Sequence, residues 1–188
     1  MCFGLHEEVP YCPETRVITN LFCDDRGSPP RVAAILFADG HVLYIDMEPS
    51  ASTLACSRSR RDNQIMGLEL LAIALGLSTF SMILRGRRVR VWSDNTGNEA
   101  SLRKGRARAF DHNALVLFLT RKAALDKLHL WVGRVPSELN IEILPTGESY
   151  EVLHSLRAEA VPAVLDTAFT CPEAWESLPI KQALPRKA

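Results

Sequence analysis

The stretch VRVWSDNTG, which spans Val89–Gly97, is the most informative segment of the sequence. Its first half alternates apolar and polar side chains as far as Asp94, which is typical of a β-strand, and the Asn-Thr-Gly that follows is typical of the start of a helix. An unpaired carboxylate on a buried face costs several kcal/mol unless a cation or hydrogen bonds compensate for it. Asp94 is therefore a candidate functional residue at a strand-to-helix junction.

Two more carboxylates occupy positions of the same kind. Glu69 lies within Ile65–Leu75, a stretch that is otherwise almost wholly apolar, and Asp24 ends the strand-like run that begins at Arg16. Hard divalent cations such as Mg²⁺ prefer oxygen ligands, and Asp and Glu supply them. Three carboxylates that converge from two strand ends and a core helix predict a divalent-metal site, which points to phosphodiester chemistry.

Each of these carboxylates also has a purely structural explanation. Asp24 can begin a turn together with Asp25, and Asp94 can cap the helix that follows it. Glu69 can belong to a narrow polar stripe of its helix together with Gln64. We favour the metal site because the three carboxylates occur together within a consistent order of secondary-structure elements.

The composition predicts one domain with a single core. The chain has 188 residues, of which 47% are hydrophobic, and this is enough to build one core. We expect the domain to cover residues 17–160, between an N-terminal extension (1–16) and a proline-containing tail (161–188). The formal net charge is zero, so attraction for nucleic acid must come from local arginine clusters and not from an overall field.

Other features of the sequence bear on location. The five cysteines form no Cys-x-x-Cys pair, which favours a reduced, intracellular protein of the cytoplasm or nucleus. No basic segment followed by an apolar run stands at the N-terminus, and the apolar helix around Glu69 is too short to span a bilayer. We therefore expect no membrane partner. Met1, with no polymerase sequence ahead of it, favours a stand-alone product.

The predicted elements have a mixed α/β order. We expect strands at Val17–Cys23, Arg31–Phe37, His41–Asp46, Arg87–Asp94 and Leu128–Val135, and helices at Asn63–Leu84, from Thr96, at Asp111–Lys127 and at Tyr150–Arg157. Asp39-Gly40 is typical of a hairpin turn, so the first three strands should form an antiparallel meander. The fourth and fifth strands each follow a helix and should run parallel to their neighbours. The expected architecture is an α/β fold with a five-stranded mixed sheet flanked by helices.

Capping patterns mark the expected helix starts. Thr96 and Glu99 have the spacing of a capping box, and Asp111 or Asn113 should cap the next helix. The segment 48–62 is rich in serine and arginine, and we expect it to be a linker that leads into the long apolar helix.

Several short motifs together resemble one known family. The pieces are VWSDNTG (91–97), RKG (103–105), FDHN (110–113) and RVPSELNI (134–141), with DNQI (62–65) and ELLA (69–72) upstream. They resemble the ribonuclease H-like domain that follows the reverse transcriptase in retrotransposons of the tyrosine-recombinase type, over roughly residues 17–153. The resemblance implies a ribonuclease H-like fold, hydrolysis of the RNA strand of RNA:DNA hybrids, and a reverse transcriptase domain as a candidate partner.

The resemblance also implies roles for particular residues. It assigns Asp24, Glu69 and Asp94 as catalytic metal ligands, with two Mg²⁺ or Mn²⁺ ions if the site is active. At the fourth ligand position the family has Asp and this chain has Ile143, which cannot bind a metal. Glu142, one residue away, is the carboxylate that could replace it. The departure implies weakened turnover.

The resemblance further implies a nucleic-acid surface. The basic residues Arg103, Lys104, Arg106 and Arg108 follow the third carboxylate and could bind the phosphate backbone. Ser93, Asn95 and Asn140 could form hydrogen bonds with sugar hydroxyls. The alternative function is a catalytically inactive ribonuclease H-like module that binds nucleic acid or a protein. Ile143 favours this alternative, whereas the three intact carboxylates favour the enzyme.

Overall fold

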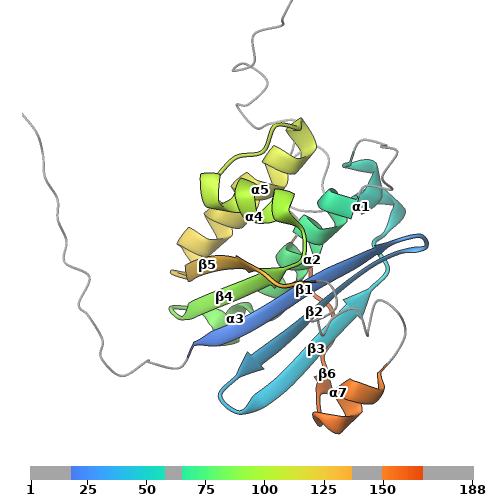
Figure 1. The fold of residues 1–188 in the computed structure, drawn as a ribbon, viewed down its shortest axis with the longest axis vertical. Coiled ribbons are helices and arrows are strands. Elements are labelled where there is room, and N and C mark those ends of the chain that lie inside the picture. Colours follow the sequence, from blue (N-terminus) through green and yellow to red (C-terminus); the bar gives the residue numbers. More distant parts are fainter. Residues whose placement is uncertain (1–17, 58–64, 137–149, 167–188) are drawn as a thin grey trace, which may run out of the picture.

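The computed structural model describes residues 18–57, 65–136 and 150–166 (Figure 1). The strands are β1 (Thr19–Gly27), β2 (Pro30–Ala38), β3 (His41–Met47), β4 (Arg88–Ser93), β5 (His129–Arg134) and β6 (Glu159–Ala160). The helices are α1 (Ala51–Ala55), α2 (Ile65–Thr79), α3 (Ser81–Leu84), α4 (Thr96–Lys104), α5 (Phe110–Leu125) and α7 (Glu151–Ser155).

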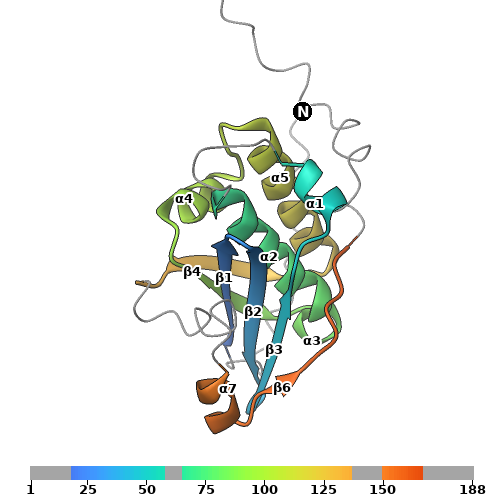
Figure 2. The ribbon, with the colours of Figure 1, turned by 90° about the vertical axis from the view of Figure 1, so that its right-hand side faces the viewer.

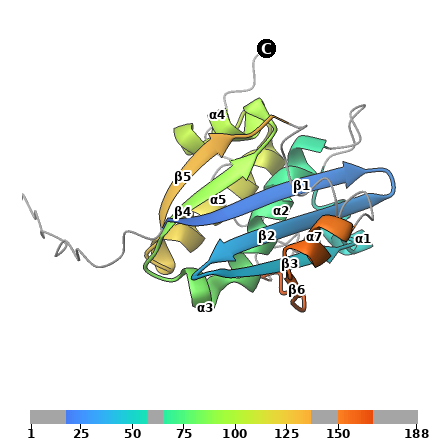
Figure 3. The ribbon, with the colours of Figure 1, turned by 60° about the horizontal axis from the view of Figure 1, so that its bottom comes forward.

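The strands form one mixed sheet in the order β5-β4-β1-β2-β3-β6. Strands β1, β2 and β3 are an antiparallel meander, while β4 runs parallel to β1 and β5 runs parallel to β4. Figure 3 shows β1, β4 and β5 pointing the same way. This order and these directions are those of a ribonuclease H-like fold, which confirms the expected fold class. The described part of the sheet has six strands and not five, because the two-residue β6 pairs with the outer side of β3.

The hairpin between β2 and β3 fits its turn residues. Asp39 and Gly40 have φ values of 53° and 80°, and this left-handed pair makes the tight turn between β2 and β3 that the sequence predicted. Strand β1 is longer than expected, because pairing with β2 continues without a bulge as far as Gly27 opposite Pro30. The two aspartates 24 and 25 therefore lie within β1 and do not begin the turn.

The long helix is buried on all sides. Every residue of α2 from Gly67 to Ser78 is buried, in agreement with the apolar sequence. A Cβ on Gly76 would lie only 3.1 Å from side-chain atoms of Leu21 and Ala34, so the missing side chain lets α2 approach β1 and β2 closely. The expected single helix Asn63–Leu84 is instead two helices, because the backbone leaves the helical conformation at the buried Phe80 (φ −90°, ψ 11°).

The helices α2 and α5 pack on each other along one face of the sheet (Figure 2). Among the described residues, no helix is long and apolar enough to cross a membrane. The expected linker 48–62 contains the short helix α1, whose N-cap Ser50 accepts a hydrogen bond from the Thr53 N–H.

Two capping predictions were wrong. The N-cap of α4 is Asn95 and not Thr96, and the Asn95 side-chain oxygen accepts hydrogen bonds from the N–H groups of Gly97 (2.8 Å) and Asn98 (3.3 Å). The N-cap of α5 is Ala109, which has no side chain that could form a capping bond. Asn113 instead accepts a bond from the Ala107 N–H at 2.9 Å, and this ties the loop before α5 to the helix.

Candidate carboxylate site

The ends of two parallel strands bring carboxylates to one edge of the sheet. Strand β1 pairs in parallel with β4 up to Phe22 opposite Trp92. The residues that follow in the two strands are therefore neighbours. They include Asp24 and Asp25 in β1 and Asp94 just after β4. The C-terminal ends of parallel strands are where α/β folds commonly build their functional sites.

The alternation along β1 decides which aspartate faces the helix α2. Leu21 and Cys23 lie in the core beneath α2, and the unbroken pairing with β2 keeps the alternation regular beyond them. Successive side chains of a strand point to opposite faces, so Asp25 lies on the α2 side and Asp24 on the other side. The sequence assigned the first ligand to Asp24. Its neighbour Asp25 lies on the side of Glu69, while Asp24, which is only 6% exposed, lies on the other side of the strand and adds its charge to the surroundings of Asp25.

Glu69 is held by hydrogen bonds at the sheet-facing side of α2. It precedes Gly76 by seven residues, which is close to two helical turns, so both residues face the sheet. The Glu69 side chain is only 3% exposed, and one of its oxygens, Oε2, accepts bonds from the Ser93 hydroxyl and from Asn98 Nδ2 (3.2 Å). The Asn95 N–H in turn donates to the Ser93 hydroxyl oxygen at 3.2 Å. Glu69 thus connects α2 to the β4–α4 junction.

Burial makes Glu69 a weak acid. Loss of contact with water raises the pKa of the Glu69 carboxyl to about 7, and the nearby charge of Asp94 acts in the same direction. The hydrogen bonds from Ser93, Asn95 and Asn98 stabilise the ionised form and oppose this rise. Glu69 therefore titrates near neutral pH in the protein without metal.

The pKa of Asp25 is shifted further than that of Glu69, and the sequence analysis did not name Asp25 as a site residue. Burial raises the pKa of the Asp25 carboxyl to about 9, with further contributions from the charges of Glu69, Asp24 and Asp94 in that order. Its Oδ2 atom is buried and has no hydrogen-bond partner within the described residues. The alternation from Leu21 and Cys23 was the sequence signal that could have identified Asp25.

The donor chemistry of this cluster fits a hard divalent cation. Asp25, Glu69 and Asp94 supply oxygen atoms only, and a bound cation would offset the burial and the smaller charge repulsion that raise the pKa values of Asp25 and Glu69. The unsatisfied Asp25 Oδ2 is a buried acceptor that such an ion would occupy. In residues 18–57, 65–136 and 150–166, however, no three His, Cys, Asp or Glu side chains are already arranged around a common point. Metal binding would have to draw the carboxylates closer together.

Some of the residues expected to bind nucleic acid already form hydrogen bonds or ion pairs within the protein, and others are exposed. Ser93 is fully buried and donates to Glu69, and Asn95 caps α4. Arg103 pairs with Glu99 at 3.1 Å, and its Nε donates to the Val132 carbonyl oxygen at 3.3 Å. The exposed basic residues that follow are Lys104, Arg106 and Arg108. Asn140, Glu142 and Ile143 lie outside the described residues.

Comparisons with known proteins add a likeness to solved structures. No family model matches the chain, and no curated protein matches it. Among solved structures, the chain is similar to the crystal structure of RNase H1 from the halophilic archaeon Halobacterium salinarum NRC-1, with 13% sequence identity and a TM-score of 0.49. The match covers 66% of this chain and 89% of the archaeal one. Our assignment of the fold rests on the strand order and directions given above.

Proposed function

We propose that the protein is a metal-dependent ribonuclease H-type endonuclease that hydrolyses the RNA strand of RNA:DNA hybrids. The observation that carries the proposal is the group of carboxylates formed by Asp25 and Asp94, at the ends of parallel strands, and Glu69 of the helix α2, in a ribonuclease H-like fold. The family resemblance of the sequence supports the same activity. We further propose a retroelement origin, an intracellular location and a reverse transcriptase domain as partner.

The residues of the site would divide the work as follows. Two Mg²⁺ or Mn²⁺ ions bound by Asp25, Glu69 and Asp94 would supply an activated water and neutralise charge at the scissile phosphate. Asp24, the ligand expected from the sequence, adds negative charge from the adjacent position. Ser93 and Asn98 fix the orientation of Glu69 through their hydrogen bonds. Lys104, Arg106 and Arg108 would bind the phosphates of the hybrid without reading its sequence.

The absence of an aspartate at position 143 is expected to weaken turnover without abolishing it. The family pattern places a fourth carboxylate there, and Ile143 offers no oxygen to a cation. With fewer ligands the second ion should be held less tightly, so activity should need high Mg²⁺ concentration or the use of Mn²⁺. Glu142 is the neighbouring carboxylate that could partly compensate.

The test is cleavage of an RNA:DNA hybrid carrying a label on its RNA strand, with Mg²⁺ or Mn²⁺, by wild type, Asp25→Asn, Asp94→Asn and Ile143→Asp. We expect slow wild-type cleavage, loss of cleavage on either aspartate substitution, and faster cleavage by Ile143→Asp. Glu151→Gln, which removes one exposed carboxylate from α7, is the matched control and should cleave like wild type.

Two other outcomes would change the conclusion. Cleavage that appears only in Ile143→Asp would identify a ribonuclease H scaffold whose activity has been lost at one position. Absence of cleavage by every variant would refute the nuclease and leave a module that binds nucleic acid or a protein.

A further inference from the structure

A half-exposed tryptophan lies among arginines on the edge of the sheet. Trp131 is in the edge strand β5 with 48% of its side chain exposed, and Arg90 of β4 is its direct neighbour in the parallel pairing. The Arg90 guanidinium lies 5.8 Å from the centre of the Trp131 ring, and that of Arg103 lies 5.9 Å from it. These are distances at which a cation and an aromatic ring attract each other.

The Trp131 ring is fixed by its surroundings. It packs edge-to-face against Trp92, with ring centres 5.4 Å apart. A Cβ on Gly133 would lie 2.3 Å from an atom of the Trp131 ring, so the ring rests on backbone that only glycine leaves open. A large aromatic side chain that is exposed and yet held in place costs little entropy when a ligand packs on it.

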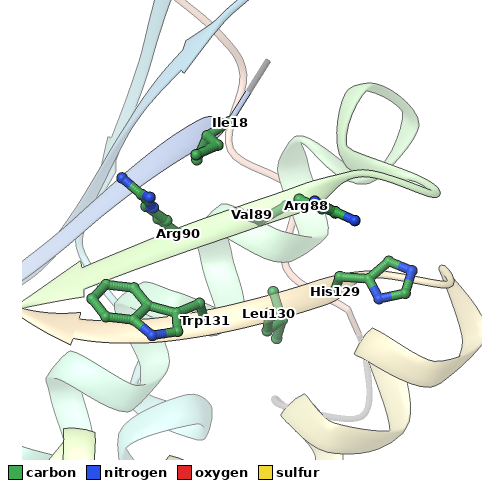
Figure 4. A pocket seen from close by; sticks show the side chains of 7 residues that line it. All are labelled: Ile18, Arg88, Val89, Arg90, His129, Leu130 and Trp131. Atoms are coloured by element: carbon green, nitrogen blue, oxygen red, sulfur yellow. The ribbon is translucent and has the colours of Figure 1, made fainter. Parts of the chain in front are cut away.

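A basic hollow opens beside this tryptophan. It has a volume of about 450 Å³, and Figure 4 shows Arg88, Arg90, His129 and Trp131 around it, with Ile18 at one end. Among the residues that the structure describes, no acidic side chain lines it. Both arginines are exposed, and neither forms an ion pair with any carboxylate in the described ranges. The hollow therefore offers positive charge that no carboxylate of the described residues neutralises.

The hollow is separate from the carboxylate site. The side chains of Val91 and Ser93 face α2, so Arg90 and Trp131 lie on the opposite face of the sheet. Arg90 also precedes Asp94 by four residues, which corresponds to about 13 Å along a strand. A ligand in the hollow would not touch the cluster of Asp25, Glu69 and Asp94.

We propose that this hollow binds single-stranded nucleic acid, with a base stacked on Trp131 and phosphates bound by Arg88 and Arg90. An aromatic ring beside unneutralised arginines is the combination by which proteins bind single strands without sequence preference. A duplex hides the faces of its bases, so it could use the arginines and not the tryptophan. The inference rests on the proposed function, because it adds a place where the single-stranded overhang of a partly hybrid substrate is held.

The test is the binding of fluorescently labelled oligo-dT to the full chain, measured by anisotropy in EDTA. Trp131→Ala should weaken binding on the order of tenfold, and Trp131→Phe should restore most of the affinity. Replacing both Arg88 and Arg90 by Ala should lower the slope of log affinity against log salt concentration by about 1.4, because two phosphate contacts are lost. Arg121→Ala, at an exposed arginine of α5, is the control and should bind like wild type.

Three results would overturn the inference: unchanged affinity in Trp131→Ala, an equal loss in Arg121→Ala, or a preference of the wild type for duplex over oligo-dT. If Trp131→Ala does not fold by circular dichroism, the exposed substitution Arg90→Glu takes its place, and unchanged binding there is equally decisive. The assay contains neither metal nor hybrid. A chain without nuclease activity can therefore bind as expected, and an active nuclease can fail to bind.

Discussion

Asp25→Asn should stabilise the metal-free protein. The pKa of the Asp25 carboxyl is raised from 3.8 to about 9, so at pH 7 the folded protein must either take up a proton or carry an unfavourable charge that the unfolded chain carries freely. The interval between the ordinary pKa of 3.8 and pH 7 is about three pH units, and each unit corresponds to about 1.4 kcal/mol. The upper limit of the free-energy cost to folding is therefore about 4 kcal/mol. Asparagine has nearly the same shape and avoids this cost.

The pH dependence has a definite sign. A carboxylic acid whose pKa is raised in the folded state binds more protons folded than unfolded, so stability falls as pH rises from about 4 to about 9. The raised pKa of Glu69, about 7, adds to the fall in the lower part of this range. We expect the wild type without metal to lose about 1 kcal/mol per pH unit between pH 5 and pH 8, and Asp25→Asn to lose clearly less.

The assay is urea unfolding in EDTA at several pH values between 5 and 8. Asp24→Asn is the matched comparison, because it changes the adjacent residue on the other face of β1 and should flatten the pH dependence less than Asp25→Asn, by the share that the Asp24 charge adds to the raised pKa of Asp25. Equal stability of wild type and Asp25→Asn at pH 8, with the same slope in pH, would refute the placement of Asp25 among the carboxylates. Stronger flattening by Asp24→Asn than by Asp25→Asn would refute the argument from strand alternation.

Three further predictions concern the same molecule. Mg²⁺ should raise the melting temperature of the wild type at pH 8 and not that of Glu69→Gln, because an ion that binds the folded state stabilises it; equal shifts would argue against Glu69 as a ligand. Ser93→Ala should raise the pKa of Glu69 further and lower stability by roughly 1–3 kcal/mol, with the larger loss at pH 8, as measured by urea unfolding at pH 5 and pH 8. Gly133→Ala should displace the Trp131 ring and cost roughly 1–3 kcal/mol, seen as a lower urea midpoint together with altered near-ultraviolet circular dichroism.

Local patterns predicted much of the fold. The turn at Asp39-Gly40 and the fourth strand around Val89–Ser93 lie where the sequence places them, because turn chemistry and alternation act over a few residues. The break of the long helix at Phe80 was missed, since no glycine or proline marks it and its ring is buried in the tertiary structure. The cap of α4 was misplaced by one residue, because Asn95 and Thr96 are both suitable capping residues.

The metal site stays a prediction, and the structure adds one candidate residue to it. Glu69 and Asp94 could be named from the sequence because a charge in apolar surroundings, or at a strand end, is visible there, and their role as metal ligands remains a prediction. Asp25 was missed because motif matching gave priority to its neighbour. The buried Leu21 and Cys23 alternate along the strand, and this alternation places Asp25 on the same face as them. The electrostatic coupling of these residues depends on the parallel pairing of β1 and β4, which joins segments distant in sequence and is set only by the whole fold.

The hydrogen bond from Arg103 to the Val132 carbonyl has a consequence for association between molecules. Strand β5 forms one border of the sheet, and the free backbone groups of such a border invite a strand from another chain to add to it. The Nε of Arg103 donates a hydrogen bond to one such acceptor, the Val132 carbonyl oxygen, and this places a charged side chain beside the strand. At the other border, β6 has only two residues and offers little length for pairing. The border at β5 is thus partly protected against the sheet-to-sheet growth that leads to aggregation.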